Sequence, residues 1–82
     1  MTDYNGWKNR QTWNVALWIK NDEPLYRAAV DYVKTHPTKR ALYSGFCDYA
    51  GLTGNRTPDR IAWQSTRICY RELNAMMREL VS

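Results

Sequence analysis

The chain has 82 residues, a net charge of +4 and 44% hydrophobic residues, with four Trp and six Tyr among them. This length predicts one domain over residues 1–82 with a small core, which aromatic side chains can supply because each buries about 150 to 250 Å². No run of about 18 apolar residues occurs and the first residues do not resemble a leader, so we expect a cytoplasmic protein that does not span a membrane.

Catalytic and metal chemistry lack the residues that they need. His36 is the single histidine, and it precedes Pro37 at an expected helix end. Cys47 and Cys69 have no CxxC partner, so we expect two reduced thiols that pack as small hydrophobic groups. The sequence therefore predicts no enzyme, no metal site and no cofactor.

The first apolar segment spans residues 12–20. It is hydrophobic on nearly every side of a helical wheel, which is typical of a central buried helix. Within it, Trp13, Val15, Leu17 and Ile19 also alternate as they would in a strand. We expect a helix here and keep a strand as the alternative.

The second segment has clear helix boundaries. Asp22 is expected to cap a helix whose first turn contains Glu23 and Pro24, because an acid favours the positive helix end and proline is tolerated there. His36-Pro37 should end it, since the residue before proline avoids the α region.

A third and a fourth helix are expected from similar signals. Thr38 is the predicted cap of the third helix, and Gly51 is predicted to end it in the left-handed region. Thr57 followed by Pro58 predicts a fourth helix from Pro58 to about Leu80. A shorter helix that begins at Ser65 or Thr66 is the alternative. The expected fold class is an all-α compact bundle of three or four helices.

The first third of the chain resembles a known signature. The residues Asn9-Arg10-Gln11-Thr12-Trp13-Asn14-Val15-Ala16-Leu17-Trp18-Ile19, then Asn21-Asp22-Glu23 and Leu25-Tyr26, are similar to those of a family of small uncharacterised phage, plasmid and bacterial proteins. The resemblance extends weakly to Thr57-Pro58-Asp59 and to residues 73–80, and Pro24 departs from the expected glycine. It implies a mobile-element accessory protein and brings no site residues with it.

The expected fourth helix carries the first candidate binding site. Its four arginines fall within about 40° of one another on the helical wheel, opposite the apolar stripe. Guanidinium groups suit carboxylate, phosphate and aromatic partners, and two aromatic residues flank the same side. A solvated face, or one paired with acids of a neighbouring helix, is the structural alternative. The candidate residues are Arg60, Arg67, Arg71, Arg78, Trp63 and Tyr70.

A second cluster of polar and aromatic residues lies near the N-terminus. Asn9, Trp13 and Asn14 predict either a buried hydrogen-bond network, which we favour, or an exposed patch. The second candidate binding patch is Trp7, Lys8 and Arg10, which would offer rings and donors to a partner.

These observations predict a non-enzymatic binding protein. We expect a phage or mobile-element accessory that docks on or inhibits a host or defence protein through an acidic surface of that partner. Nucleic-acid binding by the arginine face is the alternative.

Overall fold

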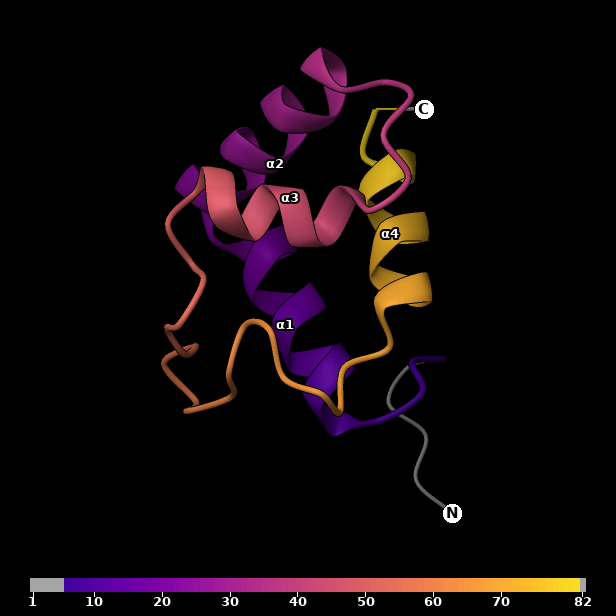
Figure 1. Cartoon of the computed structure of the whole chain (residues 1–82). Helices are drawn as coiled ribbons and strands as arrows, with labels where there is room; N and C mark the ends of the chain where they lie inside the picture. The colour runs from indigo at the N-terminus through magenta and orange to yellow at the C-terminus, as the bar shows by residue number, and fades with distance from the viewer. Residues whose placement is uncertain (1–5, 82) are drawn as a thin grey trace.

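The computed structural model describes residues 6–81, and this part of the chain contains four helices (Figure 1). They are α1 (Arg10–Asn21), α2 (Glu23–Thr35), α3 (Leu42–Tyr49) and α4 (Tyr70–Glu79). The predicted all-α bundle is confirmed, and the strand alternative for residues 12–20 is wrong. Within this range, no helix is long and apolar enough to cross a membrane. The expectation that the first residues form no leader concerns residues 1–5, which lie outside the described part.

The N-terminal helix α1 packs against α2 and α4 but is not buried all round. Its buried residues are Thr12, Asn14, Val15, Ala16 and Ile19. Leu17, by contrast, is 36% exposed. The near-uniform apolar character of residues 12–20 therefore reflects a core face together with an exposed apolar face.

The α2 boundaries are those that the sequence predicts. The Asp22 side chain accepts a hydrogen bond from the Leu25 N–H (3.2 Å), and Pro24 lies in the first turn. The helix ends at Thr35, with His36 as C-cap. Tyr32 of this helix is buried and stacks on the His36 ring, with 4.1 Å between ring centroids.

The third helix α3 begins later than predicted but ends as predicted. Thr38 does not cap it; the Tyr43 N–H in its first turn is instead satisfied by Asn74 Oδ1 of α4 (2.8 Å). Gly51 has a φ of +72°. The Leu52 N–H donates to the Cys47 carbonyl oxygen (2.8 Å), which completes a Schellman motif at the helix end.

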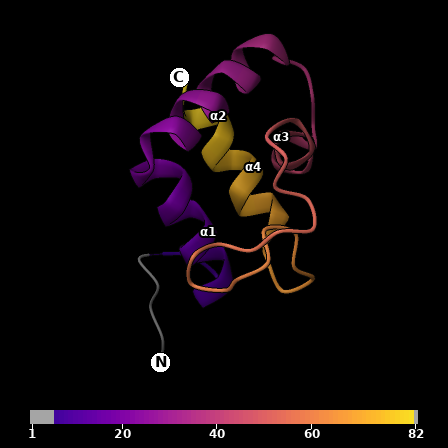
Figure 2. The same cartoon turned by 90° about the vertical axis from the view of Figure 1, so that its left-hand side faces the viewer.

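The predicted helix from Pro58 to Leu80 is wrong over its first half. Only Tyr70–Glu79 is helical. The alternative of a shorter helix is closer to the structure, but its start at Ser65 or Thr66 is wrong as well. Residues 52–69 instead form a chain of turns that lies beside α1 (Figure 2). The physical reason is that Thr57 and Asp59, the residues expected to begin a helix, form hydrogen bonds with α1 instead.

One hydrophobic core joins all four helices to this loop. Helices α2 and α4 each contact the other three. Ile19, Phe46, Leu73 and Met77 are fully buried in the core. Trp63 from the turns is 3% exposed and belongs to the same core, so the loop is an integral part of the fold.

Candidate functional site

Residues 55–63 form a short hairpin. The Arg60 N–H donates to the Thr57 carbonyl oxygen (2.8 Å), and the Thr57 N–H donates to the Ile61 carbonyl oxygen (2.8 Å). Arg60 has a φ of 69°, the one positive φ at a non-glycine residue in the described chain. Glycine usually occupies this left-handed position of a three-residue hairpin loop, so an arginine there costs about 1 to 2 kcal/mol.

Side-chain hydrogen bonds, one of them fully buried, attach the hairpin to α1. Asn14 is 2% exposed, and its Nδ2 donates to Asp59 Oδ2 (2.7 Å) while its Oδ1 accepts from Thr57 Oγ1 (2.9 Å). Trp18 Nε1 donates to the same Asp59 oxygen (3.1 Å). The Asp59 and Ile61 N–H groups both donate to Thr57 Oγ1 (3.2 Å each). The predicted network around Asn14 is therefore confirmed.

A second set of bonds fixes the other end of the same loop. Asn9 Oδ1 caps α1 by accepting from the Thr12 N–H (2.9 Å), and Asn9 Nδ2 donates to the Arg67 carbonyl oxygen (2.7 Å). Thr12 Oγ1, which is fully buried, accepts from the Cys69 N–H (2.8 Å). Residues 52–69 are thus pinned to α1 at both ends, and we call them the anchored loop.

The Asp59 carboxylate lies at an exposed position, and its hydrogen-bond donors favour its ionised form. Hydrogen bonds from Asn14 and then from Trp18 lower the pKa of Asp59 below its usual value, and the positive charge of Arg10 lowers it further. The negative charge of Asp59 is therefore engaged in attaching the loop.

The anchored loop presents arginines around one hollow. This hollow has a volume of about 490 Å³. We call it the arginine hollow, and its lining residues are Gln11, Arg56, Arg60, Ile61, Ala62, Ser65 and Arg67. Arg56 and Arg60 belong to the hairpin, Arg67 follows it, and Gln11 comes from the first turn of α1.

The arginine hollow has an uncompensated positive charge. No carboxylate lines it. The salt bridge within residues 6–81 joins Arg27 to Glu23 (3.3 Å) and involves none of these arginines. The first turn of α1 contains no acid either, so its positive dipole end adds to the field. The arrangement is chemically suited to an anion that accepts several guanidinium hydrogen bonds.

The structure divides the arginine face that the sequence predicts. Arg60 and Arg67 lie on the anchored loop and line the arginine hollow. Arg71 and Arg78 lie on α4, where Arg78 donates to the Arg40 carbonyl oxygen (3.2 Å). The single helical face was wrong because no helix extends over Arg60 and Arg67.

The two aromatic residues expected beside these arginines are held inside the molecule. Trp63 is 3% exposed, and its carbonyl oxygen accepts a hydrogen bond from the Tyr43 hydroxyl. Tyr70 is half-buried, and its hydroxyl donates to the Ser65 carbonyl oxygen (3.2 Å). Ile61 and Ala62 supply the apolar lining of the hollow in their place.

The second predicted patch is split as well. Trp7 is half-buried and packs against the core. The Lys8 N–H donates to Glu72 Oε1 (2.9 Å), which ties the segment before α1 to α4. Arg10 is exposed in the first turn of α1, close enough to Asp59 to affect the pKa of that carboxyl.

Sequence reasoning missed the other lining residues of the hollow, which are Gln11, Arg56, Ile61, Ala62 and Ser65. A signal for Arg56 was available, because Arg56, Arg60 and Arg67 occur within one segment that also contains Gly54 and Pro58. Turn residues at this density favour a loop over a helix. Gln11 gave no comparable signal, since its role depends on how the loop packs against α1.

The described part of the structure has no metal ligand set, and it buries two of its titratable side chains, Cys47 and Tyr43. Residues 6–81 contain no group of three His, Cys, Asp or Glu side chains that could hold a metal ion. Cys47 is fully buried, and burial raises the pKa of its thiol to about 11. The pKa of Tyr43 is raised as well, mainly by burial. Both groups are held in their neutral form inside the core.

Fold and surface together define a small all-helical domain that presents a basic hollow on an anchored loop. The chain belongs to DUF7249, a family of unknown function, whose model matches residues 1–82. No curated protein and no solved structure matches the chain. The expectation of an uncharacterised family is therefore confirmed, and the function has to be argued from the site.

Proposed function

We propose that this protein is a non-enzymatic binding protein whose arginine hollow binds an acidic segment of a partner protein. The observation that carries the proposal is the convergence of Arg56, Arg60 and Arg67 on one hollow without a carboxylate in its lining. Like charges held together repel one another, so carboxylates from a partner would relieve the repulsion and form charge-assisted hydrogen bonds.

The lining of the hollow favours a protein over a nucleic acid. Protein interfaces combine arginine with apolar contacts, which Ile61 and Ala62 provide beside the three guanidinium groups. Sites for single-stranded nucleic acid follow the backbone along a groove and stack bases on aromatic rings. No aromatic side chain lines the arginine hollow.

The left-handed backbone at Arg60 supports a role in binding. A non-glycine residue with a positive φ costs free energy, and such residues cluster at functional sites. Arg60 is the one residue of this kind in the described chain, and it lines the hollow. Strain at this position serves the placement of a guanidinium group rather than the stability of the hairpin.

We further propose that the partner is a host or defence protein, which this protein occupies or inhibits in the bacterial cytoplasm. The support is the resemblance of residues 9–26 to small proteins of phages, plasmids and bacteria. An accessory protein of a mobile element meets its targets inside the host cell.

Binding of defined anions tests the proposal directly. The probes are a fluorescent peptide with clustered glutamates and a single-stranded oligonucleotide of equal charge. We expect the peptide to bind more tightly, and the oligonucleotide to bind weakly with a steep loss of affinity in salt. The triple variant Arg56→Glu, Arg60→Glu, Arg67→Glu should lose peptide binding by about 100-fold or more.

A charge-matched control separates the site from net charge. Lys34→Glu, Lys39→Glu and Arg40→Glu change the net charge equally at exposed positions that do not line the hollow. This control should retain peptide binding. Equal loss in both variants would mean that only the overall charge matters, and tighter oligonucleotide binding would assign the hollow to nucleic acid.

A further inference from the structure

The hairpin beside the arginine hollow pairs Arg56 with Ala62 in antiparallel orientation. Backbone hydrogen bonds lie on either side of this pair. On one side the Trp63 N–H donates to the Asn55 carbonyl oxygen (3.1 Å), and on the other side the Thr57 N–H is the donor. In an antiparallel ladder, the residues between two such bonds point their own N–H and C=O groups away from each other. Arg56 and Ala62 therefore direct these groups outward, at the two edges of the hairpin.

The outward backbone groups of Arg56 and Ala62 have no hydrogen-bond partner within residues 6–81. Unpaired N–H and C=O groups at the edge of a strand are a template for an added strand. The arginine hollow adjoins the Ala62 edge, because most of its lining comes from the strand of Ala62 and from the turn that follows. These lining residues are Ile61, Ala62, Ser65 and Arg67.

The side chains of Arg56 and Ala62 share the outer face of the hairpin. Side chains alternate along a strand, and the neighbouring Thr57 and Trp63 are buried on the opposite face. A residue added opposite Ala62 would have its side chain on the outer face as well. Strands are spaced by about 4.8 Å, so this residue would lie roughly 10 Å from the Arg56 backbone. The small Ala62 methyl group between them leaves room for the Arg56 guanidinium group to reach across.

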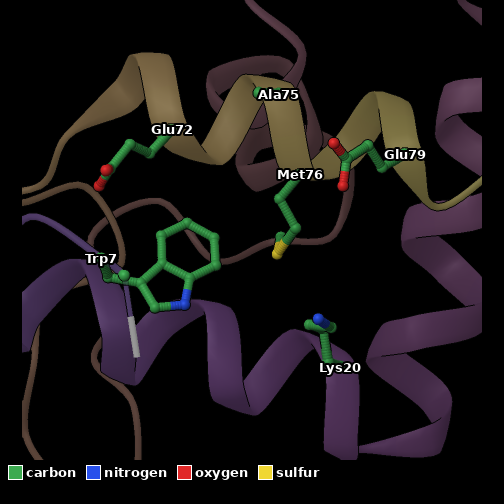
Figure 3. A pocket seen from close by; sticks show the side chains of 7 residues that line it. Trp7, Lys20, Glu72, Ala75, Met76 and Glu79 are labelled. Atoms are coloured by element: carbon green, nitrogen blue, oxygen red, sulfur yellow. The ribbon is translucent and has the colours of Figure 1, made fainter. Parts of the chain in front are cut away.

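A hollow between α1 and α4 offers an acidic segment a less favourable charge. Its volume is about 380 Å³. In Figure 3, Glu72 and Glu79 extend from α4 and Lys20 extends from α1. The arginine hollow, by contrast, has three guanidinium groups and no carboxylate in its lining. Charge therefore favours the hairpin edge as the place where an acidic segment binds.

We propose that the acidic segment of the partner binds as a third strand at the Ala62 edge, an inference that rests on the proposed function of the arginine hollow. The segment runs antiparallel to residues 61–63 and exchanges two backbone hydrogen bonds with Ala62. Its acidic residues occupy alternate positions, so that their carboxylates share the outer face with Arg56. An acid two positions further along lies beside Arg60 at the hairpin tip. The ligand is thus an extended chain with an acid at every second residue.

Backbone methylation of a defined peptide tests the added strand. The probe is a fluorescent peptide that alternates glutamate with threonine. One isomer is methylated at the glutamate backbone nitrogens and the other at the threonine backbone nitrogens. Because alternate N–H groups of a strand point to the same side, only glutamate N–H groups face Ala62. Methylation at glutamate should weaken binding to the full chain by about tenfold or more, and methylation at threonine by about twofold or less.

A substitution in the protein tests the same bonds from the other side. Ala62→Pro removes the outward N–H group, and proline is tolerated at strand edges where that group is not part of the ladder. This variant should bind the unmethylated peptide about tenfold more weakly. Ala62→Gly is the matched control, since it also removes the methyl group but keeps the N–H, and it should bind within about twofold of the parent. Circular dichroism and urea unfolding confirm that both variants fold.

The outcomes separate this inference from the proposed function. An unmethylated peptide that does not bind the parent protein contradicts the proposed function and the added strand together. A peptide that binds but loses affinity equally in both methylated isomers, or more in the threonine isomer, overturns the added strand and leaves the arginine hollow as a binding site. Full affinity of folded Ala62→Pro overturns it as well. The methylated peptides decide the question on the parent protein even where Ala62→Pro does not fold.

Discussion

Asn14 and Asp59 lie 45 positions apart in the sequence and are joined by a hydrogen bond of 2.7 Å in the structure. The bond connects a buried amide in the middle of α1 to the tip of the hairpin that carries Arg60. Because Asn14 also accepts from Thr57, its side chain has a donor and an acceptor role that alanine cannot replace. The helix thus contributes side chains to the core and also supports the binding loop.

Replacement of Asn14 by alanine should destabilise the protein by about 1 to 3 kcal/mol. The reason is that Thr57 Oγ1, which is buried, loses its acceptor, and Asp59 loses a donor. Urea unfolding measures the cost, and hydrogen exchange should show faster exchange of the hairpin amides than of those in α2. Asn21→Ala, at the exposed end of the same helix, is the control and should stay within about 0.5 kcal/mol of the parent.

The attachment of the hairpin should weaken in acid. Hydrogen bonds from Asn14 and Trp18 lower the pKa of Asp59 in the folded state, so folding favours the ionised carboxylate. The stabilisation is complete above the unfolded pKa of about 3.9 and is lost as the pH falls through the lower folded value. Urea midpoints between neutral pH and about pH 2 should therefore fall less steeply in Asp59→Asn than in the parent. Parallel curves would show that Asp59 contributes nothing to this dependence.

The glycine in the middle of α3 should resist replacement. Alanine would gain up to about 1 kcal/mol of helix propensity. A Cβ at Gly45, however, would collide with the Tyr32 hydroxyl and lie 2.6 Å from Lys39 Cε. Tyr32 is held by rings on several sides and cannot move aside cheaply. We expect Gly45→Ala to cost about 1 to 2 kcal/mol net in thermal or urea unfolding.

A second substitution tests the cause of that cost. Tyr32→Phe removes the hydroxyl that collides and leaves Cζ at 3.0 Å from the new Cβ. In this background Gly45→Ala should cost less than in the parent by about 0.5 kcal/mol or more. An unchanged cost would show that the steric contact with Tyr32 is not the reason for the glycine.

The two cysteines should react at very different rates. Cys47 is fully buried and burial raises its thiol pKa to about 11, so the native protein holds almost no Cys47 thiolate at neutral pH. Cys69 is half-buried at the start of α4. Iodoacetamide labelling followed by mass spectrometry should modify Cys69 first, and Cys47 only after denaturation. Early modification of Cys47 would mean that this part of the core opens readily.

Much of the fold was predictable because its signals are local. The Asp22 cap, the His36-Pro37 stop and the left-handed Gly51 depend on side chains within a few residues of the backbone groups that they affect. The all-α class follows from such signals together with helical periodicity. The extent of α4 did not follow, because Thr57, Pro58 and Asp59 suit a turn as well as a helix start, and distant Asn14 and Trp18 decide between them.

The candidate site was predictable only in part for the same reason. Arg60 and Arg67 were identified from their residue type, but on a helical face that does not exist. Arg56 joins them through the hairpin, and Gln11 through the packing of the loop on α1. Long-range contacts of this kind leave no periodic trace in the sequence. The hydrogen-bonding side chains of α1 were the informative residues, because a buried amide requires partners.

The last prediction concerns Arg60 and separates binding from stability. Its φ of 69° suits glycine, so Arg60→Gly should relieve strain and raise the free energy of unfolding by about 0.5 to 1 kcal/mol. The same substitution removes one of three guanidinium groups from the arginine hollow and should weaken binding of the acidic peptide by about tenfold.

Arg56→Gly is the matched control, since Arg56 lines the same hollow without a positive φ and should lose both binding and stability. Urea unfolding and peptide titration of both variants measure the two effects. A destabilised Arg60→Gly would show that the arginine side chain holds the hairpin together, whereas a stabilised variant with full peptide affinity would remove Arg60 from the binding site.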